Sequence, residues 1–232
     1  LSWSGVDPSQ ELIDEYFMAN GKAIGDPGSG YDPQNPYTNR EKRFYESIVY
    51  DGSVWAGSEI IMKQGVGSRN ETDLASKNES TNTGYYIRKG LDPKYAINGN
   101  HMQSSANYII FRYAEVLLAY AEVQNEAVGP DQSVYDAINE VRDRVDLPAL
   151  ENGLTQEEMR KAIYQERRVE LAFEDKRYLD LIRLKLAEKN LNGHMHAMLI
   201  EKEGGVWKYK VIPATQGEMV FHAEKNFTVS FG

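Results

Sequence analysis

Three glutamates at four-residue spacing are the best candidates for chemistry in this sequence. Glu166, Glu170 and Glu174 lie in the stretch QERRVELAFE, where a helix would place all three on one face. A pair of carboxylates hydrolyses glycosidic bonds, but the two acids must lie on either side of the bond. Carboxylates on consecutive turns of one helix point the same way. Arginines that would neutralise them follow in or near the stretch: Arg167, Arg168, Arg177 and Arg183. We therefore interpret the glutamates as members of an ion-pair network between helices, with a surface glycoside hydrolase as the alternative.

Other catalytic and metal sites are not predicted. The chain has no cysteine and four histidines, of which His194 and His196 would share a strand face. No third metal ligand lies at a recognisable spacing from them. The sequence also lacks the G-x-S-x-G nucleophile elbow, a phosphate-binding loop, a dinucleotide fingerprint and an HExxH motif. We predict no catalytic residue, no metal and no cofactor, and we do not expect an enzyme.

Aromatic side chains give the third signal. The chain has fifteen tyrosines and three tryptophans, and many of them lie in its polar first hundred residues. Flat rings stack on the apolar faces of sugars, while amide, carboxylate and guanidinium groups bond the hydroxyls. The candidate sugar-binding residues are Trp3, Trp55, Tyr31 and Tyr37. Trp3 is the first choice, because its Ser and Gly neighbours offer no apolar surface that would bury an indole.

Composition excludes several classes of protein. The 232 residues are 41% hydrophobic and 26% charged, which is typical of a folded globular chain. The net charge is −9, and lysine and arginine are not clustered, so a nucleic-acid partner is not expected. No run of about 18 apolar residues predicts a transmembrane helix. The chain begins with LSWSG, without Met or a signal peptide, and we expect it to be a fragment of a longer protein.

Three consecutive segments differ in their predicted structure. Residues 1–106 are loop-rich, with residues 44–50 as one short strand. Residues 107–190 have helical periodicity. Residues 191–232 return to loops and short strands, with Gly204-Gly205 as a turn between two strands.

The apolar spacing within residues 107–190 predicts four helices in two hairpins. Gly129-Pro130 ends the first helix, and Ser133 would cap the second. Thr155 and Glu158 form a capping box for the third. The expected helical core comprises Tyr113, Leu117, Ala121, Val141, Ile163 and Phe173. Each hairpin has about the length of a tetratricopeptide repeat, a unit that buries its faces by stacking on its neighbours.

Six motifs in a fixed order resemble the SusD/RagB family. They are PSQELIDEY with NGK, YDPQNPYTNREKRF, GYYIRK, RYAEVLLAYAE, INEVRDR, and ERRVELAFE with RYLDLIR. Two departures stand out, since Asp175 replaces the customary glycine and Glu41-Lys42 replace Asp-Pro. The family's C-terminal motif and N-terminal half are absent from this chain, so the resemblance identifies residues 1–232 as the C-terminal region.

The resemblance implies both a fold and a function. The implied fold is mainly α, with tetratricopeptide-like helical hairpins, loop-rich segments and a few short strands. It places a ligand face in the loop-rich residues 1–106. The implied function is non-catalytic binding of oligosaccharides and their delivery to a SusC-like TonB-dependent transporter. The protein would be a surface lipoprotein of the outer membrane, held by an N-terminal lipid anchor outside this chain. A helical-repeat scaffold that binds only proteins is the remaining alternative.

Overall fold

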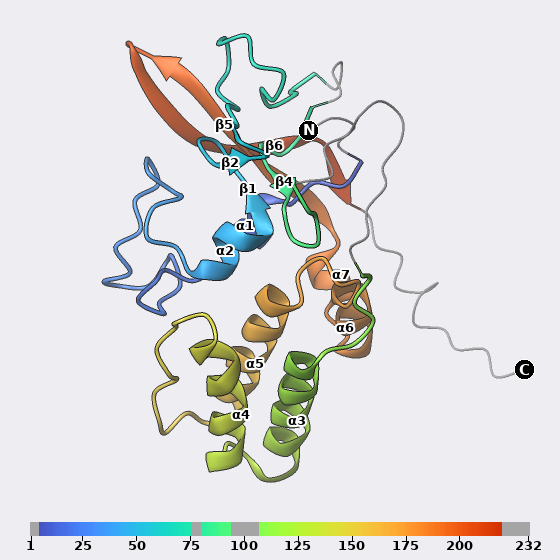
Figure 1. Cartoon of the computed structure of the whole chain (residues 1–232). Coiled ribbons are helices and arrows are strands. Elements are labelled where there is room, and N and C mark those ends of the chain that lie inside the picture. The colour runs from blue at the N-terminus through green and yellow to red at the C-terminus, as the bar shows by residue number, and fades with distance from the viewer. Residues whose placement is uncertain (1–4, 76–79, 94–106, 220–232) are drawn as a thin grey trace, which may run out of the picture. The chain divides into compact units, whose positions relative to one another are not determined.

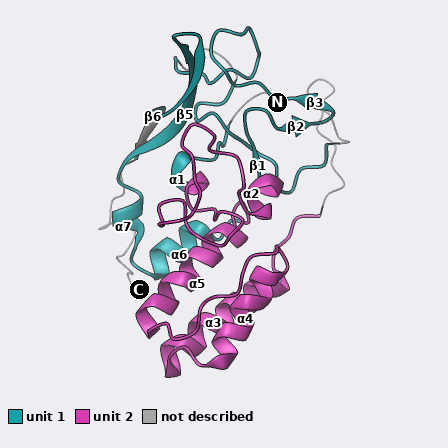
Figure 2. Cartoon of the chain, turned by 90° about the vertical axis from the view of Figure 1, so that its left-hand side faces the viewer, with its two compact units in different colours: residues 1–11, 48–104, 175–232 teal, residues 12–47, 105–174 magenta. Residues whose placement is uncertain are grey.

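The computed structural model describes residues 5–75, 80–93 and 107–219 (Figure 1). Contacts group the chain into two compact units, each discontinuous in sequence (Figure 2). The helical unit comprises residues 12–47 and 105–174. The hairpin unit comprises residues 1–11, 48–104 and 175–232. None of the helices in the described ranges has the length and apolar character needed to cross a lipid bilayer.

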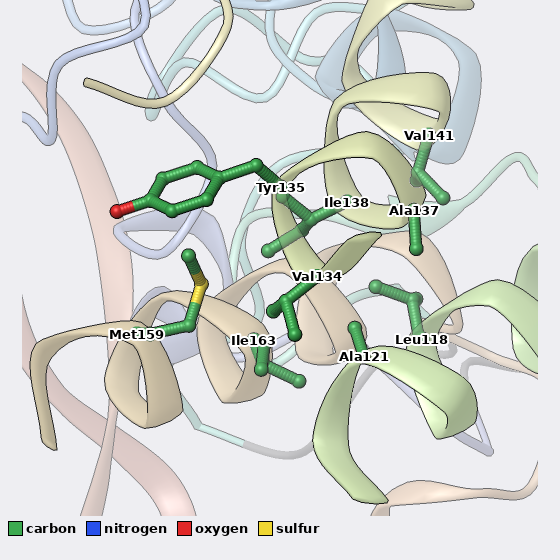
Figure 3. Close-up of a cluster of buried hydrophobic side chains, with 9 residues drawn as sticks. All are labelled: Leu118, Ala121, Val134, Tyr135, Ala137, Ile138, Val141, Met159 and Ile163. Atoms are coloured by element: carbon green, nitrogen blue, oxygen red, sulfur yellow. The ribbon is translucent and has the colours of Figure 1, made fainter. Parts of the chain in front are cut away.

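Three helices build the helical unit. They are α3 (Tyr113–Val128), α4 (Gln132–Asp143) and α5 (Gln156–Glu170). Two short helices come earlier in the chain, α1 (Gln10–Ile13) at the boundary of the units and α2 (Lys42–Ser47). Side chains from α3, α4 and α5 point toward one another in a shared core (Figure 3). Its members are Leu118, Ala121, Val134, Tyr135, Ala137, Ile138, Val141, Met159 and Ile163.

The helix ends follow local hydrogen-bonding rules. Thr155 and Glu158 form the predicted capping box, each side chain bonding a backbone amide of the other's residue. The predicted cap of α4 is wrong, because Asp131 holds that position. Its carboxylate accepts from the amides of Ser133 and Val134. A carboxylate also interacts favourably with the positive end of the helix dipole, so Asp131 outcompetes the serine two residues later.

Two members of the predicted core are placed differently. Tyr113 is the first residue of α3 and is 64% exposed, because the buried stripe of that helix runs through Leu118 and Ala121 instead. Phe173 lies beyond the end of α5, half-buried, with a φ of 63°. Asp175 follows with a φ of 58°, the left-handed conformation that explains a glycine in the SusD/RagB pattern.

The hairpin unit contains the strands. β1 (Ile48–Val49) pairs with β4 (Tyr86–Ile87), and β2 (Val54–Trp55) pairs with β3 (Ser58–Glu59), all antiparallel. β5 (Gly193–Glu203) and β6 (Val206–Met219) form a long hairpin around the predicted Gly204-Gly205 turn. Two further helices, α6 (Arg177–Arg183) and α7 (Ala187–Asn190), occupy the predicted fourth helical stretch. The predicted strand at residues 44–50 is wrong over its first half, which is helical in α2.

Gly84 joins the hairpin to the rest of its unit. A Cβ at this residue would lie 2.5 Å from the carbonyl oxygen of Met198, and its φ is +79°. The amide of Met198 donates to the carbonyl of Thr83 at 2.8 Å. Only glycine allows this close approach of two backbones in this conformation.

Candidate functional site

Glu166, the first glutamate of the stripe, is fully paired inside the helical unit. It accepts from Nη1 of Arg43 at 2.5 Å and from Nη1 of Arg142 at 2.9 Å. Arg43 also donates from Nε to Glu41 at 2.6 Å. The side chains of Glu41, Arg43, Arg142 and Glu166 are all buried. Their ion pairs therefore replace the contacts with water that these charged groups lose on folding.

Glu170 and Glu174 continue the same network. Glu170 accepts from Arg43 at 3.0 Å, from Arg112 at 2.6 Å and from Arg144 at 2.7 Å. Arg112 turns its other edge to Glu174, with Nε and Nη2 donating at 2.7 and 2.8 Å. Two parallel hydrogen bonds from one guanidinium edge to one carboxylate form a bidentate pair, which is stronger than a pair joined by a single bond.

Burial and the neighbouring arginine charges shift the pKa values of these acids in opposite directions. Burial alone would raise the pKa of Glu170, but the hydrogen bond from Arg112 and the charges of Arg43 and Arg144 hold it below its ordinary value. Glu41 responds differently. Burial raises its pKa, and the nearby Arg43 offsets only part of the rise. Glu170 is therefore held as a carboxylate by its partners.

The predicted ion-pair network is confirmed, and arginines far from the three glutamates in sequence supply ion-pair partners that the prediction did not name. The arginines next to them in sequence project from other faces of the helix and bond elsewhere: Arg167 lies 3.6 Å from Glu115, and Arg168 bonds Glu15. The distant partners come from α2, from α4 and from the residues that flank α3 and α4. Each of the three carboxylates bonds at least one arginine, so the three do not provide two free acids on either side of a glycosidic bond. The hydrolase alternative therefore lacks the acids on which it depended.

Tyr31 is the better-organised of the two candidate tyrosines. Its ring is half-buried, and the guanidinium carbon of Arg40 lies 5.8 Å from the ring centroid. Arg40 itself is fixed, because it donates to the carbonyls of Ile13, Tyr16 and Pro36 at 2.6–3.0 Å. Burial raises the pKa of Tyr31, so its hydroxyl stays protonated and can donate a hydrogen bond.

Tyr37 is joined to the same Arg40 through Phe44. Its ring stacks on Phe44, with centroids 6.1 Å apart and planes 16° from parallel. Arg40 also lies 4.9 Å from the Phe44 centroid, so Phe44 and Arg40 connect the two tyrosines. The stack covers one face of the Tyr37 ring, and only its other face or edge could meet a ligand.

Trp55 belongs to the hairpin unit. It is half-buried in β2 and packs against Val49, Ile60 and Met62. The guanidinium carbon of Arg88 lies 5.9 Å from its ring centroid. A half-exposed indole on a rigid support, next to a hydrogen-bond donor, has the composition of a sugar platform.

The remaining candidates divide into two kinds. Trp3 lies outside the described residues. Nδ1 of His196 lies 2.6 Å from the carboxylate of Glu11, which accepts a hydrogen bond from it and gives the histidine a structural partner. Within the described ranges, no group of three acids or histidines is arranged to hold a metal ion.

Trp207 is an aromatic site that the sequence did not single out. Its ring is half-buried, and the ammonium groups of Lys63 and Lys202 lie 5.9 and 5.7 Å from the ring centroid. Lys202 is its cross-strand partner in the β5–β6 hairpin, so strand alternation around Gly204-Gly205 would have been the signal.

Comparison with known proteins gives a consistent result. The model of the SusD family matches residues 1–216. SusD-like protein P2 of Formosa agariphila is 40% identical over 112 residues, covering 45% of this chain and 21% of the relative. SusD-like protein P25 of the same organism is 44% identical over 89 residues, covering 37% and 17%.

Two solved structures from Bacteroides fragilis share the fold. A protein described as a SusD-like carbohydrate binding protein has a TM-score of 0.77 at 28% identity, covering 98% of this chain and 47% of the other. A second SusD-like protein has a TM-score of 0.74 at 29% identity, covering 95% and 43%. The mainly α, tetratricopeptide-like fold is thereby confirmed. The chain spans under half the length of these structures and about a fifth of the curated relatives.

Proposed function

The chain belongs to the SusD family, and from this membership we propose that it forms part of a protein that binds oligosaccharides without cleaving them. The bound sugar would pass to a SusC-like TonB-dependent transporter. The protein would act at the cell surface, anchored to the outer membrane by a lipid on a segment outside these 232 residues. Neither nucleic acid nor a cofactor has a role in this proposal.

The observation that carries the proposal is the likeness to the Bacteroides fragilis protein described as carbohydrate-binding. It extends over 98% of this chain with a TM-score of 0.77. The commitment of Glu166, Glu170 and Glu174 to arginine supports the non-catalytic part, because it removes the acids best spaced to serve a hydrolase.

We propose two ring platforms for the sugar. Trp55 with Arg88 offers an indole on a packed support and a guanidinium for hydroxyl groups. Tyr31 offers a phenol held by the fixed Arg40, beside exposed Asp32. Tyr37 and Trp3 remain candidates, the first with one ring face covered by Phe44.

A glycan array with the full-length protein, followed by titration of the best ligand, tests this function. Trp55→Ala or Tyr31→Ala should weaken binding about fivefold, since one stacked ring contributes on the order of 1 kcal/mol. Tyr178→Ala is the matched control, because Tyr178 is also an exposed ring. Failure to retain any glycan would refute the function, whereas unchanged affinity in both ring variants would refute only the platforms.

A further inference from the structure

Two lysine side chains approach the ring of Trp207 in the hairpin unit. The Nζ atoms of Lys202 and Lys63 lie 5.7 and 5.9 Å from the ring centroid. Both distances are near the outer limit of a cation–π interaction, so neither ammonium group is tightly held by the indole. An aromatic ring and two positive charges therefore lie together at one place on this unit.

Backbone pairing brings these three residues together. Lys202 is the cross-strand partner of Trp207 next to the turn of the β5–β6 hairpin, so both side chains point to the same face (Figure 1). The amide of Gln64 donates to the carbonyl of Ile200 at 2.8 Å, which holds the preceding residue, Lys63, beside β5. The positions of both lysines relative to the ring are thus set by main-chain hydrogen bonds.

Asp51 fixes Lys63 and is itself inaccessible to a ligand. Its side chain is 1% exposed, and it accepts from the ammonium group of Lys63 at 2.7 Å and from the amide of Met62 at 2.9 Å. Burial would lower the pKa of Lys63, but the hydrogen bond and the charge of Asp51 raise it above its ordinary value. The charge of the exposed Glu59 adds to this rise. Lys63 is therefore a fixed cation at neutral pH.

The other face of the hairpin carries charges that neutralise one another. There Lys210 bonds Glu201 at 2.8 Å and also bonds Glu203. Lys202 is exposed on the Trp207 face, and its ammonium group forms no ion pair within the described ranges. A ligand at the ring thus meets positively charged hydrogen-bond donors, although the net charge of the chain is −9.

We propose that Trp207, Lys202 and Lys63 bind an acidic sugar residue, with its ring against the indole and its carboxylate or sulfate bonded to the two ammonium groups. The inference rests on the proposed function and names the class of glycan. Hydrogen bonds between ionised groups are roughly twice as strong as those between neutral ones, so these donors favour an anionic sugar over a neutral one. A local pair of cations also offsets the repulsion between an acidic glycan and an acidic protein.

Matched pairs of oligosaccharides test the proposal on the full-length protein. The panel contains oligogalacturonates and alginate oligosaccharides with their carboxyl-reduced forms, and carrageenan oligosaccharides with their desulfated forms, so that the two arms distinguish carboxylate from sulfate. At least one acidic member should bind about tenfold more tightly than its neutral counterpart in calorimetric titration. This preference should weaken as salt concentration rises.

Three variants locate the preference. Lys202→Gln should lower the affinity for the preferred acidic member about tenfold, and Trp207→Ala should lower it about fivefold. Lys208→Gln is the matched control, because it removes the same charge from the adjacent residue, whose side chain points to the other face of the strand. Since Lys202 is exposed, Lys202→Gln keeps the test valid if Trp207→Ala unfolds.

Three results would overturn the inference. Equal affinity for both members of every pair would mean that charge is not recognised. An equal loss in Lys202→Gln and Lys208→Gln would assign the preference to the general field of the protein, and unchanged affinity in Lys202→Gln and Trp207→Ala would place it elsewhere. A protein that binds only neutral glycans would fail this inference and keep the proposed function, whereas binding to no glycan would refute the function itself.

Discussion

The substitution Glu170→Gln tests the ion-pair network at its most connected residue. The side chain of Glu170 is fully buried and bonds three arginines, whose side chains are 6% (Arg43), 23% (Arg112) and 56% (Arg144) exposed. Glutamine keeps the shape but removes the charge. Its amide group would also turn a donor toward guanidinium donors that need an acceptor.

The expected loss is about 3–5 kcal/mol, the cost of leaving a buried charge without its partner. Arg43 is the least exposed of the three but keeps Glu41 and Glu166 as partners, so the loss should lie near about 3 kcal/mol, the lower end of this range. Arg144 adds little, since water screens a side chain that is more than half exposed. A chain of this size loses about 2–4 °C of Tm per kcal/mol, so Tm should fall by about 10 °C.

Urea denaturation followed by circular dichroism measures this loss. Glu157→Gln is the matched control, because Glu157 forms ion pairs on the exposed surface of the same helix and should change stability little. A loss in Glu170→Gln no larger than in Glu157→Gln would refute the reasoning.

Three further predictions concern the core, the backbone and pH. Ile163→Ala should cost about 2–5 kcal/mol in urea unfolding, because Ile163 is fully buried among three helices. Gly84→Ala should also destabilise the fold, by more than about 1 kcal/mol, since its Cβ would meet the carbonyl of Met198; a neutral result would contradict that contact. The stability that Glu170 contributes is present above its ordinary pKa of 4.5 and is lost as pH falls through its depressed value, so wild type and Glu170→Gln should converge in acid. A difference in unfolding free energy between wild type and Glu170→Gln that widens in acid would contradict this assignment for Glu170. Glu41 has a raised pKa and therefore the opposite sign, so the stability that it contributes falls as pH rises from 4.5.

Local signals in the sequence predicted local structure well. The Thr155–Glu158 capping box and the Gly204-Gly205 turn depend on residues a few positions apart, and both are confirmed. The phase of α3 was harder, because apolar residues occupy two faces of that helix. Periodicity alone does not separate the face that Leu118 buries from the one that Tyr113 exposes.

Contacts between distant residues were outside the reach of sequence reasoning. The partners of Glu166 and Glu170 include Arg43, which precedes them by more than 120 residues. Spacing along a helix identifies charged groups that need partners, but only the packed fold brings the partners to them. The same holds for the rings, since the support of Trp55 and the nearby Arg88 come from separate segments of the hairpin unit.

Binding without cleavage is the central claim, and one titration tests it. The full-length protein is titrated calorimetrically with the oligosaccharide selected on the array, and the sugar is then recovered and sized by chromatography. We predict saturable binding and an oligosaccharide recovered at its original length. Shortened products, or the absence of binding to every glycan tried, would contradict the account.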